Sequence, residues 1–535
     1  MIEEQGTTDL AGLLAPVLAR APDAPAIVDD EGTLSYAGLW SAARRAATGL
    51  AGLGVGEGDR VALWLPNVAA WPILFLGCAL RGAIVVAVNT RFRSAEVADI
   101  LGRSGATVLA CAPGFRQIDF LGILGGLEAG ALAHLHAVIV HGPMPDDVPP
   151  ALAGIDLVPY AQILAGAEAE PGTDRAQAPA ILFTTSGTTR APKFVLHRQA
   201  GIAAHSARVA HSFGFTDGSS AQLAMLPLCG VFGFNLALAT FAAGAPLHLM
   251  PVFEADGAAE RIHRHGISHL FGSDDMFDRL LGTTEADPAF PSVRWAGYAA
   301  FNSALADLPV RAEARGLRLC GLYGMSEIQA LFAVQPHQAS LPGRALAGGM
   351  PASPLARVRV REVGGEALLA PGEAGEVEIA GPSVMAAYFG DDEATARTVT
   401  ADGFVRTGDL GHLTPDGGFV FLSRLGDVLR LGGFLVNPLE IEEHIQALPG
   451  VAAAQVVAAA QTGGTRPVAF VIPAPGAQVA PAAVIEHCRA ALAGYKVPVR
   501  VLVVEDFPRT QSPNGLKIQR ARLRAMAEEA LAGSA

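Results

Sequence analysis

The chain has 535 residues, of which 51% are apolar and 17% are charged, and its formal net charge is −13 at pH 7. This length and apolar content predict a globular protein of several domain-sized units with a large core, and they exclude a disordered chain. The acidic balance disfavours nucleic acid or an anionic membrane as a partner, so local positive charge is expected to serve a small anionic ligand such as a nucleotide.

The cysteines and the N-terminus indicate the compartment. The five cysteines are scattered and never form a C-x-x-C pair, which argues against a disulfide framework or a structural zinc site. The acidic N-terminus is not followed by the basic and then apolar order of a signal peptide. We therefore expect a protein of the reducing cytoplasm.

Short β-rich runs alternate with amphipathic segments from about residue 26 to residue 322. The pattern predicts helices at 69–80 and 94–101, and strands at 59–65, 83–88, 180–185, 222–228 and 246–250. Such alternation is typical of parallel β-α units, so we expect an α/β sheet with helices on both faces. The most apolar stretch, Val68–Val88, is interrupted by Pro72 and Arg81, which predicts a buried helix and a core strand rather than a membrane span.

The pattern changes between Arg357 and Arg424 to short alternating strands with Gly and Pro turns, which predict a small β-barrel or antiparallel sheet. A smaller α+β unit is expected after Arg424, with helices at 438–448 and 481–492 and strands at 452–458, 467–472 and 499–504. We therefore expect a large N-terminal α/β domain at 1–424, β-rich from about residue 340, and a smaller C-terminal domain at 425–535.

Lysine is rare in this chain, because only Lys193, Lys496 and Lys517 stand among 38 basic residues. A compact ammonium fits against a phosphate or carboxylate where a planar guanidinium would clash, so each lysine is a candidate ligand contact. Lys496, in Gly-Tyr-Lys-Val-Pro, fits a structural role and a phosphate-facing role equally well.

Lys193 ends a run of ten residues that holds five hydroxyl side chains and one glycine, directly after a predicted strand. Backbone N–H groups and hydroxyls of such a loop can donate to phosphate oxygens, although a Ser/Thr-rich turn is the alternative. The Walker pattern is absent. The predicted triphosphate contacts are Thr184, Thr185, Ser186, Gly187, Thr188, Thr189 and Lys193.

Four further motifs follow in order along the chain. They are Gly321-Leu-Tyr-Gly-Met-Ser-Glu327, Arg406-Thr-Gly-Asp409-Leu, the run from Ser423 to Gly433, and the segment from Pro508 to Arg520 that contains Gly515-Leu-Lys517. Together with the 184–193 run they closely resemble the adenylate-forming superfamily of acyl-CoA synthetases, non-ribosomal peptide adenylation domains and firefly-type luciferases. The resemblance covers residues 26–524.

The resemblance implies a two-step reaction, in which a carboxylate attacks the α-phosphate of ATP to form an acyl-adenylate and a thiol then displaces AMP. It implies that Glu327, with Thr185, holds Mg²⁺, that Ser326 contacts the α-phosphate and that Lys517 is catalytic. Asp409 matches the ribose-binding aspartate, although a turn-forming Asp is the alternative, and Arg424 is expected at the ribose or phosphates. The implied contacts around the adenine are Tyr298, Ala299, Tyr323, Gly324 and Met325, although a purely structural role of Tyr298 is the alternative.

The resemblance also implies that the C-terminal unit swings between two orientations. One orientation brings Lys517 to the site, and the other brings Gly432 and Gly433 to frame the tunnel for the thiol. The pivot is expected at Gly426 and Asp427. Relatives usually carry Asp or Lys at the pivot, but glycine can absorb a large change in dihedral angle.

Several residues depart from the family pattern. Arg190 and Phe194 stand where the phosphate loop usually has glycine, and Cys229 with Gly230 replaces the usual aromatic residue and His beside the acid. No Asp follows Gly230 to hold a substrate ammonium, so an α-amino acid is disfavoured. The expected lining of Gly230, Phe232, Phe234 and Phe301 is apolar and suits a fatty, aryl or alicyclic acid, although about half of it is expected to be core.

Coenzyme A is the expected thiol, because no carrier-protein domain is fused and the chain ends soon after Arg524. A free-standing acyl carrier protein is the alternative acceptor. A luciferase-like oxygenase and a non-catalytic nucleotide- or acyl-binding sensor are competing functions, and the set of Lys517, Glu327, Asp409 and Arg424 counts against the sensor. A homodimer is a further expectation.

We expect Lys517→Ala to lose about 10²–10³-fold or more in acyl-adenylate formation, because a fixed ammonium stabilises the charge that develops on the carboxylate oxygen and the α-phosphate. The same variant is expected to convert supplied acyl-adenylate to thioester normally, which AMP release would measure. Equal losses in both half-reactions would contradict the division of labour between two orientations.

Overall fold

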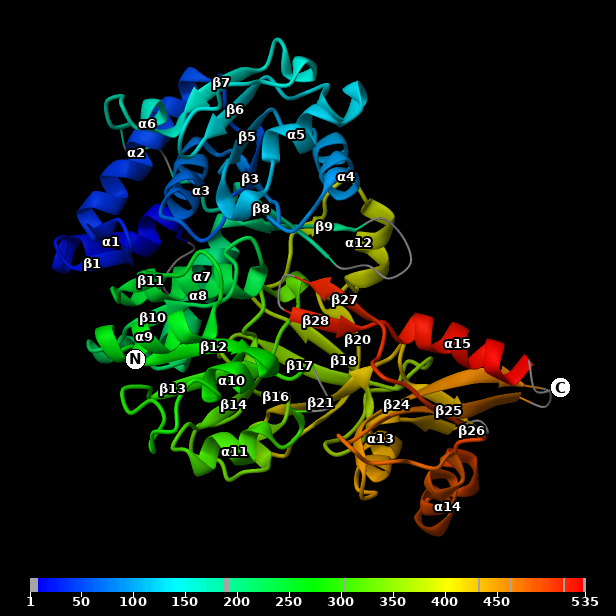
Figure 1. The fold of residues 1–535 in the computed structure, drawn as a ribbon. Helices are drawn as coiled ribbons and strands as arrows, with labels where there is room; N and C mark the ends of the chain where they lie inside the picture. Colours follow the sequence, from blue (N-terminus) through cyan, green and yellow to red (C-terminus); the bar gives the residue numbers. More distant parts are fainter. Residues whose placement is uncertain are drawn as a thin grey trace.

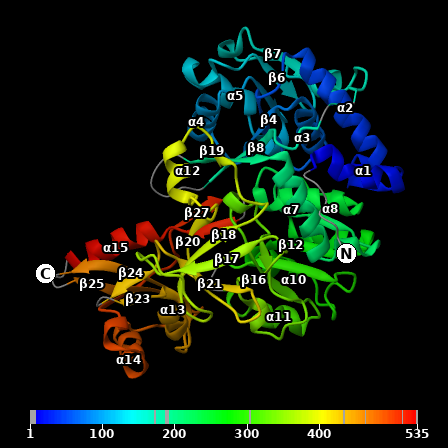
Figure 2. The same cartoon turned by 180° about the vertical axis from the view of Figure 1, so that it is seen from behind.

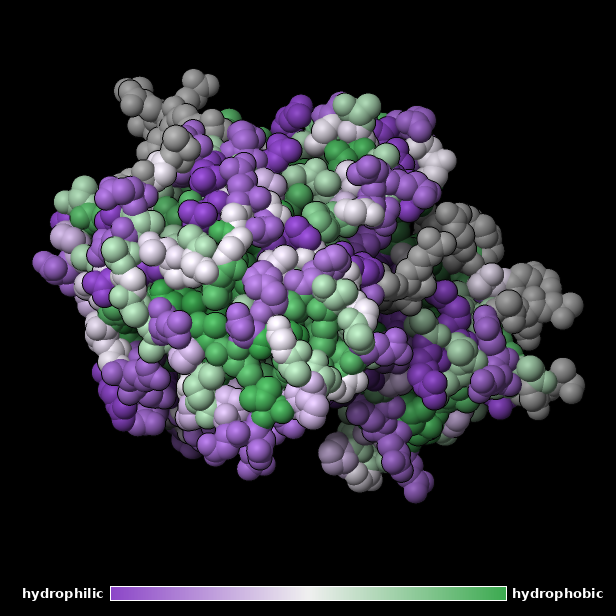
Figure 3. Space-filling model, turned by 90° about the horizontal axis from the view of Figure 1, so that it is seen from above, coloured by the Kyte–Doolittle hydropathy of each residue, from purple (hydrophilic) through white to green (hydrophobic). Residues whose placement is uncertain are grey.

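The computed structural model describes residues 8–170, 172, 174–185, 192–301, 305–431, 434–461, 464–512 and 515–532. Two large sheets with their helices make up most of the chain, and a smaller α+β part follows at the C-terminus (Figure 1). Seen from above, a hollow separates the larger body from the smaller one on that face (Figure 3).

The first large sheet has eight strands, in the order β19-β9-β8-β4-β3-β5-β6-β7. The predicted β-α units are confirmed by β3 (Arg60–Trp64), α3 (Ala70–Arg81), β4 (Ile84–Ala87) and α4 (Ser94–Ser104). Strands β3, β4, β5, β6 and β7 are parallel, whereas β9 pairs antiparallel with β8 and β19. The other strands are β5 (Val108–Cys111), β6 (Ala137–Val140), β7 (Asp156–Pro159), β8 (Pro179–Thr184), β9 (Phe194–Arg198) and β19 (Ala387–Tyr388).

The second large sheet has thirteen strands and joins a parallel part to an antiparallel part. The antiparallel strands expected between 357 and 424 are present, and they continue the sheet because β21 pairs with β16. The parallel part holds β1 (Pro25–Asp29), β10 (Gln222–Ala224), β11 (Leu247–Leu249), β12 (His269–Ser273), β13 (Trp295–Ala299) and β14 (Leu319–Tyr323). The remaining strands are β2 (Gly32–Ser35), β15 (Ala333–Val334), β16 (Gly348–Pro351), β17 (Arg357–Arg361), β18 (Gly375–Ala380), β20 (Val405–Leu413) and β21 (Phe419–Arg424).

The core lies where the helices of the two large sheets meet. Helix α8 (Val231–Ala243) is apolar except for the buried Asn235 and Thr240, and it packs against α7 (Gln199–Ser212) and α3. A helix that is apolar all round belongs in a core, and no helix among the described residues is long and apolar enough to cross a membrane.

The C-terminal part confirms the predicted helices and strands as α13 (Pro438–Gln446), β24 (Val451–Gln461), β25 (Gly464–Pro473), α14 (Pro481–Ala491) and β26 (Arg500–Val503). It adds the hairpins of β22 (Leu429–Leu431) with β23 (Phe434–Val436) and of β27 (Arg509–Ser512) with β28 (Gly515–Ile518), and the helix α15 (Arg520–Ala532). The buried Glu442 of α13 accepts from the Val456 backbone at 2.8 Å and pairs with Arg520 at 2.9 Å, which ties three elements together.

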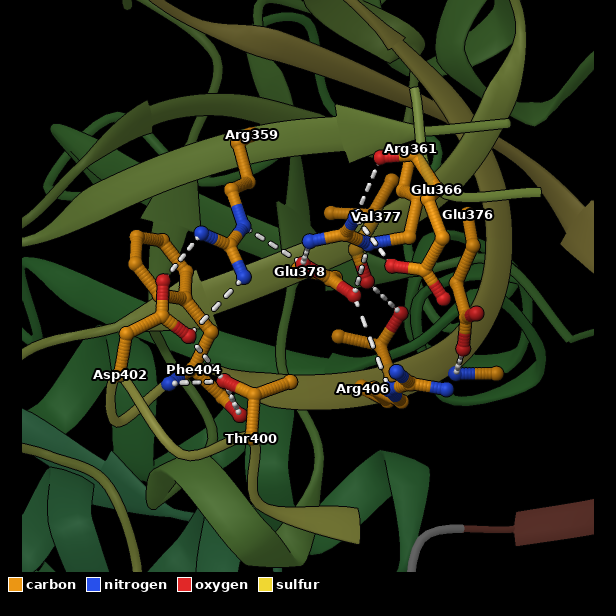
Figure 4. A network of polar contacts seen from close by, with 12 residues as sticks. Arg359, Arg361, Glu366, Glu376, Val377, Glu378, Thr400, Asp402, Phe404 and Arg406 are labelled. Carbon is orange, nitrogen blue, oxygen red and sulfur yellow. Dashed lines mark hydrogen bonds and ion pairs between the residues drawn. The ribbon is translucent and has the colours of Figure 1, made fainter. Parts of the chain in front are cut away.

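A fully buried carboxylate, Glu378 of β18, ties the antiparallel strands together (Figure 4). Arg359 Nε and Arg361 Nε of β17 donate to its two oxygens at 2.5 and 2.8 Å, and Arg406 Nε of β20 lies 3.8 Å away. Burial opposes ionisation, but the hydrogen bonds from Arg361 and Arg359 outweigh it and hold the pKa of Glu378 below its ordinary value. This clamp of Glu378 with Arg359, Arg361 and Arg406 therefore links β17 and β18 to β20.

We expect Glu378→Gln to destabilise the protein by about 3 kcal/mol, because breaking a buried ion pair leaves partly desolvated arginines uncompensated. Since the folded-state pKa is lowered, this stabilisation is lost as the pH falls below about 4. Glu366→Gln is the matched control, because its exposed carboxylate also contacts Arg361, at 3.4 Å, and is expected to cost under about 0.5 kcal/mol. Thermal midpoints compare the variants, and equal shifts would contradict the clamp.

Candidate active site

Strands β8 and β9 bracket the predicted phosphate loop. Thr184 ends β8, the backbone N–H of Thr185 donates to the Lys193 carbonyl at 3.0 Å, and the backbone N–H of Lys193 donates to Thr185 Oγ1 at 3.2 Å. These two bonds close the loop at its base. The predicted contacts Ser186, Gly187, Thr188 and Thr189, together with Arg190, lie outside the described residues.

Lys193 and Glu327 meet at one tyrosine. The ammonium of Lys193 lies 4.3 Å from the centroid of the Tyr388 ring, within the range of a cation–π contact, and the Tyr388 hydroxyl donates to Glu327 Oε1 at 2.7 Å. Tyr388 belongs to β19, which pairs with β9 next to Lys193. The structure thus brings a predicted phosphate contact and the predicted metal ligand together.

Glu327 stands in a short 3₁₀ turn (η6, Ser326–Ile328) that follows β14, with the half-buried Ser326 beside it. The three residues after this turn, Gln329, Ala330 and Leu331, have φ angles of 63°, 49° and 44°. This left-handed backbone costs about 1–2 kcal/mol for each non-glycine residue. The chain therefore reverses sharply behind Glu327, and the reversal needs support from its surroundings.

Three buried side chains provide that support by donating to carbonyls of the reversal. His197 Nε2 lies 2.7 Å from the Ser326 oxygen, His205 Nε2 lies 2.9 Å from the Ala330 oxygen, and Asn235 Nδ2 donates to the Gln329 oxygen at 2.7 Å. Burial lowers the pKa of both histidines to about 4, so they are neutral near pH 7, and their carbonyl partners require the proton on Nε2.

A second polar centre forms around Asp409 of β20, which is buried. The Tyr323 hydroxyl donates to Asp409 Oδ2 at 2.6 Å, and Arg424 Nε lies 3.0 Å from Oδ1 as an ion pair. No described residue gives Oδ1 an aligned hydrogen bond. A buried acceptor without a donor fits a ligand hydroxyl, such as those of a ribose.

Burial raises the pKa of Asp409 to about 6, against the opposing effects of Arg424 and the Tyr323 hydroxyl, and Glu327 raises it further. The folded carboxyl thus takes up a proton at a higher pH than the unfolded one. Its contribution to stability therefore decreases as the pH rises from about 4 to 6.

The predicted adenine contacts lie around the ends of β13 and β14. The Tyr323 ring meets Phe419 edge-on with centroids 4.9 Å apart, and the Tyr298 hydroxyl donates to the Ala345 carbonyl at 2.8 Å. A Cβ on Gly324 would lie 2.5 Å from the Ala330 backbone, so only glycine fits where the reversal folds back. The other two, Ala299 and Met325, are half-buried.

The four candidate residues of the acid pocket fall into two groups in the structure. Phe234 is enclosed by Trp71, Phe75 and Phe183, with ring centroids 5.9, 4.9 and 5.3 Å away, and is therefore a core residue. Gly230 is the N-cap residue of α8, and Phe232 is buried on that helix. Phe301 is half-buried and donates its backbone N–H to Asp274 at 2.7 Å. The roles of these last three residues remain predictions.

In the views of Figures 1 and 2 the hairpin that carries Lys517 is drawn over the region of β18 and β20. Lys517 belongs to β28 opposite Thr510, and its side chain lies outside the described part, as do Gly432 and Gly433. At the predicted pivot the Gly426 carbonyl accepts from Arg524 at 3.3 Å, and Asp427 Oδ2 lies 3.8 Å from Arg520.

Lys496 pairs with Glu440 of α13, which favours its structural reading.

The described residues offer two oxygen ligands for Mg²⁺, one from a carboxylate and one from a hydroxyl. Glu327 offers a second oxygen that accepts no hydrogen bond from any described residue, and Thr185 offers a hydroxyl oxygen next to Lys193. No group of three or more His, Cys, Asp and Glu side chains that could hold a metal occurs in the described ranges. One carboxylate matches an ion that takes most of its oxygen ligands from phosphates and water.

Sequence reasoning missed Tyr388, His197, His205 and Asn235. His197 carried a weak signal, because it lies four residues after Lys193 in the same β-rich run. Tyr388 stands about 60 residues from Glu327, and nothing in its neighbourhood points to a charged partner.

Comparison with known proteins places the chain in a family. The sequence model of AMP-binding enzymes matches residues 14–389, and that of the AMP-binding enzyme C-terminal domain matches residues 440–513. The chain is similar in fold to ATP-bound MatB from Rhodopseudomonas palustris, with a TM-score of 0.84, 26% identity, and coverage of 97% of this chain and 99% of that one.

Two curated relatives match over almost their whole length. One is the 3-[(3aS,4S,7aS)-7a-methyl-1,5-dioxo-octahydro-1H-inden-4-yl]propanoyl:CoA ligase of Mycobacterium tuberculosis, 31% identical over 98% of this chain and 100% of its own length. The other is the fatty acid–[acyl-carrier-protein] ligase ScoC of Streptomyces coeruleorubidus, 30% identical over 94% of this chain and 93% of its own length.

We expect adenosine binding to weaken as the pH falls through about 6, because only the ionised Asp409 accepts from both ribose hydroxyls. Adenosine isolates this contact, since it carries no titrating phosphate. Calorimetry from about pH 5 to pH 8 measures the affinity, which is expected to fall nearly tenfold per unit well below the pKa. Asp409→Asn is the control and should bind weakly at every pH; a flat profile for the wild type would contradict the assignment.

Proposed function

Because the chain belongs to the family of AMP-binding enzymes, we propose that it is an ATP-dependent carboxylic acid–CoA ligase, an AMP-forming acyl-CoA synthetase. The observation that carries the proposal is that the ammonium of Lys193 and the carboxylate of Glu327 meet at one tyrosine, with the buried Asp409 close enough for the charge of Glu327 to raise its pKa. These groups suit the phosphates, the metal and the ribose of ATP. The products are an acyl-CoA thioester, AMP and pyrophosphate.

In the first half-reaction a carboxylate oxygen of the acid attacks the α-phosphorus, and the bond to pyrophosphate breaks. Lys193 binds phosphate oxygens, Asp409 accepts from the ribose, and Arg424 stands beside it. Mg²⁺ held by Glu327 would withdraw charge from the phosphate oxygens. Lys517, carried by β28 of the C-terminal part, would stabilise the charge that develops in this step.

In the second half-reaction a thiolate attacks the acyl carbonyl, and AMP leaves with the electron pair of the broken bond. The C-terminal domain from about residue 425 swings about Gly426 and Asp427 to bring Gly432 and Gly433 to the thiol. Support comes from the junction, where a Cβ on Gly426 would meet nothing within 4 Å. Its contacts with α15 are solvent-exposed or long, and such contacts are weak.

The acid is hydrophobic, of the fatty, aryl or alicyclic class. Support comes from the apolar α8 beside the site, with Phe232 on it, and from Phe301 and Met325. The relative from Mycobacterium tuberculosis is named for an alicyclic propanoyl group and ScoC for a fatty acid. An acyl carrier protein is the second candidate acceptor, because ScoC is named for one.

The compartment is the cytoplasm, which the five buried and unpaired cysteines support. A homodimer remains a prediction.

We expect the chain to exchange labelled pyrophosphate into ATP only when a suitable acid is present. A panel of fatty, aryl and alicyclic acids with α-amino acids as controls tests this, since exchange requires reversible adenylate formation. Absence of exchange with every acid would overturn the ligase and favour a sensor. Adding CoA or a carrier protein to the active acid, and measuring the product mass, then distinguishes the two acceptors.

A further inference from the structure

Tyr388 lies between two groups of opposite charge. The face of its ring lies 4.3 Å from the ammonium of Lys193, and its hydroxyl donates to Glu327 Oε1 at 2.7 Å. Within the described ranges neither Lys193 nor Glu327 takes part in an ion pair, although both touch the same side chain. A lysine and a glutamate that can approach each other within about 4 Å attract strongly in a half-buried place.

The tyrosine is held firmly in this position. Its backbone N–H donates to Thr395 Oγ1 at 2.9 Å, and the neighbouring bonds from Ala386 to Leu196 and from Phe389 to Phe194 pair β19 with β9 at 2.8 Å each. The side chain is buried against Val195 and Met385.

We propose that Tyr388 is a positioning residue that keeps Lys193 and Glu327 apart, so that the ammonium stays available for ATP phosphates and the carboxylate for the metal. This inference rests on the proposed function, because it assumes that the two groups serve ATP and Mg²⁺. Tyr388 lies outside the five sequence motifs that indicate an adenylate-forming enzyme, so the inference gives a role to a residue that those motifs do not include.

The physical reason is the strength of the pair that Tyr388 prevents. A direct ion pair in this half-buried place would have to be broken by both the phosphate and the metal before either could bind. A cation–π contact is weaker, about 0.5–2 kcal/mol, and a phosphate displaces the ring easily. The hydroxyl occupies only one oxygen of Glu327 and leaves Oε2 for the metal.

Two substitutions separate the ring from the hydroxyl. Tyr388→Phe keeps the ring between the charges but frees Glu327 Oε1. We expect its affinity for ATP in EDTA to stay within about twofold of wild type, while the gain in affinity on adding Mg²⁺ falls about tenfold, the scale of one hydrogen bond to a charged group. Calorimetry measures both affinities without turnover.

Tyr388→Leu removes the ring as well, so Lys193 and Glu327 are expected to pair. Its ATP affinity in EDTA should fall by about 3- to 10-fold, and adding Glu327→Gln should restore it to within about twofold of the Glu327→Gln single variant. Only an ion pair formed in the absence of the ring produces this rescue. A general packing defect in Tyr388→Leu would persist in the double variant.

Tyr36→Phe is the matched control, because it removes another buried hydroxyl, which donates to the Ala245 carbonyl at 2.8 Å far from Glu327. It should lower the thermal midpoint much as Tyr388→Phe does, without changing the gain on adding Mg²⁺. The inference would be overturned if Tyr388→Phe gained as much ATP affinity from Mg²⁺ as the wild type does, or if Glu327→Gln did not rescue Tyr388→Leu. In either case, ATP binding by the wild type would still support the proposed function. Wild type that bound no ATP would overturn both.

Discussion

The pairing of β9 with β19 is the constraint on which the candidate site depends. Strand β9 begins just after the phosphate loop, and β19 comes almost 200 residues later, yet their hydrogen bonds set the ammonium of Lys193 over the ring of Tyr388. The hydroxyl of the same side chain donates to Glu327. A shift of one residue in this pairing would turn Tyr388 to the other face of the sheet and separate the two groups.

The carboxylates of the site keep oxygens available for a ligand, because their partners among the described residues do not satisfy every oxygen. Glu327 is held by a hydroxyl, and its turn is held by two histidines and an asparagine that carry no charge near pH 7. Asp409 keeps one buried oxygen without an aligned donor. By contrast, Glu378 is saturated by arginines and braces the neighbouring strands. Residues of one chemical type thus serve binding or bracing according to their partners.

The two large sheets are held together by a different kind of contact from the junction with the C-terminal part. The large sheets share a continuous apolar core with the aromatic cluster around Phe234, which resists rearrangement. At the predicted pivot, the Asp427 backbone N–H donates to the Arg424 carbonyl at 2.9 Å, and the contacts with α15 are a long ion pair at Asp427 and one hydrogen bond at Gly426. Such contacts are individually weak, so a swing of the C-terminal part is compatible with a rigid nucleotide site.

The amino-acid sequence by itself determined the alternation of strands and helices, the smaller α+β unit, and a set of motifs that includes Lys193, Glu327 and Asp409, because hydrophobic period and loop chemistry are local properties. It did not reveal Tyr388, His197, His205 or Asn235, whose partners lie about 60 to 130 residues away. The sequence also left the role of Lys496 open, and it did not distinguish Phe234, which is a core residue, from the other candidates for the acid pocket. Tertiary structure decided these points, since an ion pair, a ring contact or burial exists only once distant strands and helices have packed together.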